Sequence, residues 1–151
     1  MEERKVRYYA FVKGYADYKG HGDIDASAAY KIWCDGQEME DGAKFLKGYT
    51  SHQAELLAIL SALCKLPDGE DVIVWTNNRA LTGTALKYRN EWNRRSALGK
   101  KFGEQYDRLG HVSIKWIAKN PDDVMQNSVM DLATQAMEEV VGMNHNCYQY
   151  R

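Results

Sequence analysis

The chain has 151 residues, 44% of them hydrophobic and 27% charged, a composition typical of one globular domain with a buried core. The formal net charge of -1 excludes a general attraction to nucleic acid, so any such affinity requires a local cluster of cations. The longest apolar stretches, such as residues 56–63, fall short of the roughly 20 residues that span a bilayer. The charged first seven residues are followed by no secretory apolar core, so we expect a cytoplasmic protein.

The cysteines indicate neither a disulfide framework nor a zinc site. Cys34, Cys64 and Cys147 are widely spaced and odd in number, and they form no CxxC or Cys/His ligand pattern. We therefore expect buried or inert thiols.

The first third of the chain has the pattern of an antiparallel meander. Three runs are expected to be strands, residues 6–12, 26–33 and 43–48. Glycines and aspartates over residues 14–25 predict a turn between the first two strands. Asp35 and Gly36 are a hairpin signal between the second and third strands.

Helical periodicity begins at Thr50 or Ser51, either of which can cap a helix that ends near Pro67. A strand after this helix suggests a parallel crossover. The remaining expected elements are a strand over 72–75, a charged and mostly helical region over 80–109, a strand over 112–117 and a helix over 127–141. The sequence therefore predicts one domain over residues 1–141 and a C-terminal tail over residues 142–151.

This order of elements and two motifs resemble ribonuclease H over nearly the whole chain. Residues 49–58, YTSHQAELLA, are similar to the start of the family's first helix, where Glu55 matches a metal-binding glutamate. Residues 127–133, NSVMDLA, are similar to the family's last helix, where Asp131 matches an aspartate four residues after an asparagine. The resemblance implies an α/β ribonuclease H-like fold, with a five-stranded mixed sheet of three antiparallel strands and then two parallel ones, and helices on both faces.

The same resemblance implies that the metal site is degenerate. Family members use four acidic residues to hold two divalent ions that hydrolyse a phosphodiester, and the matching positions here are Lys13, Glu55, Asn77 and Asp131. Lys13 replaces the first acid in the motif AFVKG, and Asn77 replaces the third in WTNN. We therefore expect no catalytic residues and no metal or other cofactor. Mg²⁺ or Mn²⁺ would bind only if the domain were an active nuclease with an altered site.

Electrostatics favours a cation in place of the metals. Four acids carry a formal charge of about -4, whereas the four residues here carry about -1. Lys13 and a divalent ion about 4 Å apart would repel each other by roughly 8 kcal/mol at an effective dielectric constant near 20. We therefore predict that the ammonium of Lys13 replaces the metal and pairs with Glu55 or Asp131.

The loops offer little to compensate for the lost acids. The family's loop histidine, which assists product release, has no counterpart in residues 120–123, NPDD. Five loop aspartates could in principle rebuild a metal site, although solvated loops are the preferred interpretation: Asp17, Asp23, Asp25, Asp122 and Asp123.

Three functions remain open after the sequence. The first is a non-enzymatic binding or adaptor protein with a protein partner, which the ten tyrosines would suit because aromatic residues are enriched at interfaces. The second is a nucleic-acid-binding module for a duplex or an RNA/DNA hybrid, and its candidate residues are Lys87, Arg89, Trp92, Arg94, Arg95, Lys100 and Lys101. The third is a metal-dependent ribonuclease H with an altered site.

Overall fold

The computed structural model describes residues 6–17, 24–82 and 97–149, except for the side chains of residues 97–98 and 139–149. The strands are β1 (Tyr8–Asp17), β2 (Asp25–Cys34), β3 (Gln37–Lys47), β4 (Val72–Thr76) and β5 (Val112–Trp116). The helices with labels are α1 (Ser51–Leu63), α3 (Ala97–Arg108) and α4 (Val124–Gln149). No helix in these ranges has both the length and the apolar character that crossing a membrane requires.

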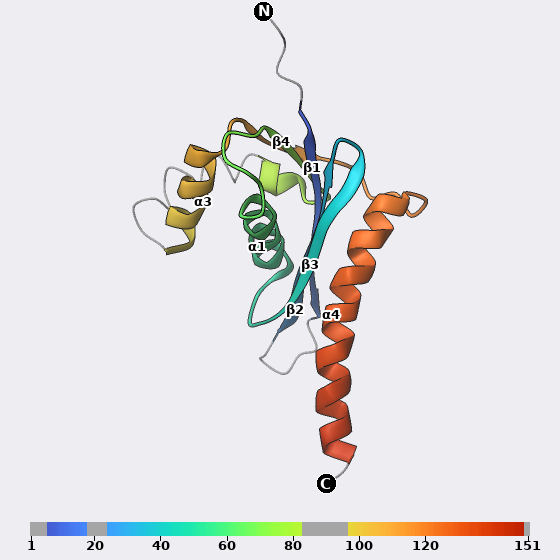
Figure 1. Cartoon of the computed structure of the whole chain (residues 1–151). Coiled ribbons are helices and arrows are strands. Elements are labelled where there is room, and N and C mark those ends of the chain that lie inside the picture. Colours follow the sequence, from blue (N-terminus) through green and yellow to red (C-terminus); the bar gives the residue numbers. More distant parts are fainter. Residues whose placement is uncertain (1–5, 18–23, 83–96, 150–151) are drawn as a thin grey trace, which may run out of the picture.

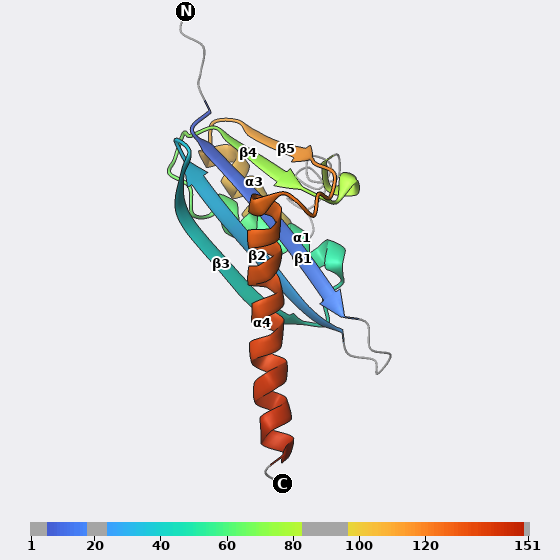
Figure 2. The same cartoon turned by 90° about the vertical axis from the view of Figure 1, so that its right-hand side faces the viewer.

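The strands form one five-stranded sheet in the order β3-β2-β1-β4-β5 (Figure 2). β2 pairs antiparallel with both β1 and β3, whereas β4 runs parallel to both β1 and β5. The predicted mixed sheet, with three antiparallel strands followed by two parallel ones, is therefore confirmed.

The sheet separates two layers of helices, with α1 and α3 on one face and α4 on the other (Figure 1). Side chains alternate between the faces of a strand. Ala10 and Val12 accordingly belong to the larger core on the α1 side, while Phe11 packs on the α4 side. Phe11 contacts Trp33 edge to face at 5.9 Å and stacks on Trp75 at 6.5 Å between ring centroids. Lys13, two residues after Phe11, lies on the same α4 side of the strand.

Helix α1 begins with a capping box at Thr50, one of the two predicted caps. The side chain of Thr50 accepts a hydrogen bond from the backbone of Gln53 at 3.1 Å, and the side chain of Gln53 accepts one from the backbone of Thr50 at 3.0 Å. This start sets the rotation of the helix and directs Glu55 toward the sheet, where it is buried.

The observed bounds of several elements differ from the predicted ones. β1 and β2 stay paired from Gly14↔Ala28 to Asp17↔Asp25, inside the segment predicted as a turn. β3 begins at Gln37, directly after a tight hairpin in which Asp35 and Gly36 have positive φ angles of 52° and 82°. Within the predicted helical region over 80–109, α3 covers residues 97–108, and residues 83–96 lie outside the described part.

The last helix is also longer than predicted. α4 starts at Val124 and continues to Gln149, so residues 142–149, predicted as a tail, are helical. Both views show its last turns extending past the end of the sheet (Figures 1 and 2).

Gly14 permits α1 to approach β1 closely. A Cβ atom built on Gly14 would lie 2.3 Å from the backbone nitrogen of Glu55 and 2.4 Å from the carbonyl oxygen of Ser51. Both contacts are backbone atoms, which cannot move without displacing the helix. The close approach of Gly14 therefore determines where Glu55 lies.

We predict that Gly14→Ala lowers the free energy of unfolding by about 3 kcal/mol, because the added methyl group forces α1 away from the sheet. The matched control is Gly48→Ala, where a Cβ atom meets nothing within 4 Å and only the φ of +82° is strained, so a loss of about 1 kcal/mol is expected. Urea denaturation measures both. Equal losses would contradict the close approach.

Candidate functional site

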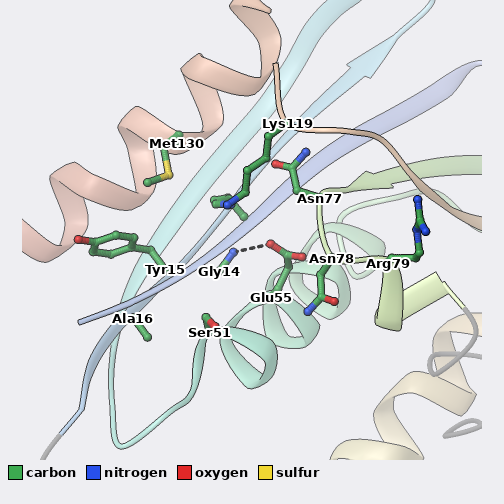
Figure 3. Close-up of a pocket in the computed structure, with 11 residues that line it drawn as sticks. Gly14, Tyr15, Ala16, Ser51, Glu55, Asn77, Asn78, Arg79, Lys119 and Met130 are labelled. Atoms are coloured by element: carbon green, nitrogen blue, oxygen red, sulfur yellow. Dashed lines mark hydrogen bonds between the residues drawn. The ribbon is translucent and has the colours of Figure 1, made fainter. Parts of the chain in front are cut away.

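A cleft of about 450 Å³ opens where the ends of β1 and β4 meet the first turn of α1 and the segment before α4. Three of the four predicted site residues, Lys13, Glu55 and Asn77, line it. Lys119, Asn77 and Glu55 converge on one space there, with Met130 on α4 at its side (Figure 3).

Glu55 is the buried acid of the cleft, with 3% of its surface exposed. Its Oε1 accepts a hydrogen bond from the backbone N–H of Gly14 at 3.0 Å, and its Oε2 accepts one from the hydroxyl of Thr76 (Figure 3 draws the first). Both carboxylate oxygens are therefore engaged by the protein. The side chain links α1 to the two central parallel strands.

Lys13 is half-buried beside this carboxylate. Burial lowers its pKa from the ordinary value of 10.5; the attraction of Glu55 opposes that shift, and repulsion from Lys119 adds to it. Within the described part of the chain, no carboxylate oxygen lies within 4.0 Å of the Lys13 ammonium. The expected close ion pair with Glu55 or Asp131 therefore does not form, because the oxygens of Glu55 are directed at Gly14 and Thr76.

Asn77 fixes the loop on the far side of the cleft. Its Nδ2 donates to the carbonyl oxygen of Ile117 at 2.9 Å and to Oε1 of Gln126 at 3.1 Å. A carboxylate could donate neither hydrogen bond. The amide at this position therefore attaches the end of β4 to the segment that leads into α4.

Asp131 does not line the cleft; the α4 residue that does so is Met130. Val129 and Ala133 are buried against the sheet, and Asp131, midway between them in the sequence, is exposed on the outer side of the helix. The signal was present in the sequence, because residues four apart share one face of a helix. The apolar spacing of Val129, Ala133 and Met137 predicts that Asp131 points to solvent.

Two cations in the cleft were missed by the sequence argument. Lys119, in the segment between β5 and α4, points into the cleft. Arg79 lies at its rim, with its guanidinium carbon 4.2 Å from the ring centroid of Trp116. No sequence pattern distinguished Lys119 from other surface lysines. The pairing of Arg79 with Trp116 depends on the parallel alignment of β4 with β5.

The predicted basic stretch lies apart from this cleft or outside the described residues. Lys100 and Lys101 are exposed on α3 and do not line the cleft. The other five candidates fall in the segment that the structure does not describe, namely Lys87, Arg89, Trp92, Arg94 and Arg95.

The loop aspartates do not join the cleft either. Asp17 and Asp25 are opposite each other in the strand register at the end of the β1–β2 hairpin. Asp123 caps α4 by accepting a hydrogen bond from the backbone N–H of Met125 at 2.9 Å. Asp122 is exposed, and Asp23 lies outside the described residues. In the part of the chain that the structure covers, no three His, Cys, Asp or Glu side chains come together as metal ligands would.

The residues of the cleft do not fit a pair of divalent ions. Mg²⁺ and similar ions bind through oxygen ligands, mainly carboxylates. The four corresponding positions here present an ammonium group, an engaged carboxylate, an amide whose N–H₂ is bonded inside the protein, and a thioether. Together they carry no net formal charge.

Solved structures share this fold. No protein-family model matches the chain, and no curated protein matches it significantly. RNase H1 of Halobacterium salinarum superposes with a TM-score of 0.68 at 17% identity, covering 88% of this chain and 98% of that one. LC11-RNase H1 in complex with an RNA/DNA hybrid superposes with a TM-score of 0.64 at 16% identity, and the match covers 89% of this chain and 99% of that one.

A third similar structure is part of a much larger protein. The foamy viral protease-reverse transcriptase, in complex with an RNA/DNA hybrid, gives a TM-score of 0.71 at 14% identity, covering 87% of this chain and 20% of that one. At such identities the likeness establishes the fold. The chain therefore has the ribonuclease H-like fold that its motifs resemble.

We predict that Lys13→Met raises the free energy of unfolding by about 0.5 to 1 kcal/mol, because a half-buried charge without a close partner is replaced by an apolar group of similar length. Lys44→Met, on the exposed part of β3, should change it by less than about 0.5 kcal/mol. Thermal unfolding of both variants and the parent measures the difference. A melting temperature that falls in Lys13→Met alone would mean that the ammonium supports the fold.

Proposed function

We propose that this chain is a catalytically inactive ribonuclease H-like domain that acts as a non-enzymatic binding protein through its cleft. The supporting observation is the ammonium of Lys13 beside Glu55, whose two oxygens are already bonded to Gly14 and Thr76. Two-metal hydrolysis requires ligands that hold both ions close to the attacking and leaving oxygens. The ammonium of Lys13 would repel a divalent ion and so opposes the binding of both ions at this position.

The charge of the cleft favours an anionic partner, and nucleic acid is the anionic polymer present in two of the similar structures. A protein partner, preferred from the sequence because of the tyrosines, has less support. Of the tyrosines with described side chains, Tyr49 alone is exposed, at 37%, and the others are buried or half-buried. A binding role for nucleic acid is therefore the stronger form of the proposal.

The direct test is an incubation of the protein with a labelled RNA/DNA hybrid and Mg²⁺ or Mn²⁺. We expect no cleavage above the background of the buffer, because no free carboxylate is among the described residues that line the cleft and could position the ions. Glu55→Gln and Asp131→Asn are the matched pair of variants, one inside the cleft and one outside. Cleavage that disappears in Glu55→Gln and persists in Asp131→Asn would show an active nuclease and contradict the proposed lack of catalysis.

A further inference from the structure

The cleft carries an excess of accessible positive charge. Lys13, Arg79 and Lys119 line it. Among the described lining residues Glu55 alone carries a carboxylate, and it is buried with both oxygens hydrogen bonded. Among the ion pairs of the described residues, none involves these three cations. A cleft lined by charges of one sign attracts ions of the opposite sign, so the gathering of these cations points to an external anion.

The two lysines enter the cleft from different elements. Lys13 comes from the central strand β1 and Lys119 from the segment before α4, and each repels the other's charge, which contributes to the lowered pKa of Lys13. The repulsion would be relieved by an anion between them. Phosphate oxygens are suitable, because an ammonium group is a compact donor that binds phosphate as a point charge.

Arg79 lies at the rim of the cleft, where its guanidinium packs on Trp116. Its guanidinium lies 4.2 Å above the ring of Trp116, and the Nε1 of Trp116 in turn donates to the carbonyl oxygen of Asn77 at 3.2 Å. Trp116 is 40% exposed. A guanidinium fixed on an aromatic ring keeps its donors free for phosphate and offers a flat surface to a neighbouring base.

The shape of the cleft suits a strand better than a single small ion. A second cavity of about 260 Å³ shares Lys13, Asn77, Lys119 and Met130 with the first and continues toward Gln126 at the start of α4. The two lysines thus line both cavities, and Arg79 lines the larger one. Cations spread along an open groove match the linked phosphates of a polymer.

We infer that Lys13 and Lys119 together bind a backbone phosphate of nucleic acid directly, without a metal ion, and that Arg79 on Trp116 contacts the adjacent nucleotide. This inference rests on the proposed non-catalytic function. It adds a ligand class and a set of contacts that do not depend on divalent ions.

The test measures fluorescence anisotropy of labelled oligonucleotides of about 12 nucleotides, as single strands and as RNA/DNA hybrids, in EDTA at salt concentrations between about 50 and 200 mM. We expect the full chain to bind at low salt with an affinity that added Mg²⁺ does not increase. Lys13→Gln with Lys119→Gln should weaken binding at least about tenfold and reduce the slope of log K against log salt by about two.

Lys44→Gln with Lys47→Gln is the matched control, because it removes the same charge from exposed positions on β3 outside the cleft. Lys119→Gln alone, on an exposed loop, and Lys13→Arg, which keeps the charge, separate lost contacts from lost folding. No binding by the parent at low salt, or equal weakening in both double variants, would overturn the inference. If the parent bound inorganic phosphate and no oligonucleotide, the assignment to nucleic acid would be wrong. None of these outcomes would imply cleavage activity, so they are distinct from a failure of the proposed non-catalytic function.

Discussion

The carboxylate of Glu55 joins the three elements that form the cleft. It is buried, and it accepts one hydrogen bond from the backbone of Gly14 on β1 and one from the hydroxyl of Thr76 on β4. A buried charge is tolerable only when hydrogen bonds replace its hydration. Because Gly14 has no side chain, α1 comes close enough to the sheet for these bonds to form, and this approach places Glu55 between β1 and β4.

Lys13 lies beside this buried carboxylate. Burial lowers the pKa of Lys13, the attraction of Glu55 raises it, and the repulsion from Lys119 lowers it. The net effect is a lowered pKa. An ammonium held in this way stabilises the fold little. It instead keeps a positive charge in the cleft, where the lining residues Asn77 and Met130 add no carboxylate to that of Glu55. The cleft is therefore better suited to anions than to divalent cations.

Much of this was predictable from local patterns. The meander, the capped helix with Glu55 and the parallel strands have short-range signals, and the motif around Lys13 pointed to a residue that lines the cleft. The length of β1 was missed because pairing with β2 overrides the turn signal of the glycines near its end. Asp131 was assigned from a motif, whereas the helical spacing of Val129 and Ala133 determines that Met130 faces the cleft. Arg79 and Lys119 enter it through tertiary contacts, which no local pattern encodes.

The central proposal is that the ammonium of Lys13, the amide of Asn77 and the thioether of Met130 leave the cleft around Glu55 without the oxygen ligands that divalent ions require. Calorimetric titration with Mg²⁺ tests it most directly, comparing the parent with a variant that carries Lys13→Asp, Asn77→Asp and Met130→Asp. The account predicts no binding heat in the parent and saturable binding in the variant, with a Kd on the order of 10⁻³ M or tighter. Saturable binding of Mg²⁺ by the parent that is lost in Glu55→Gln would contradict it.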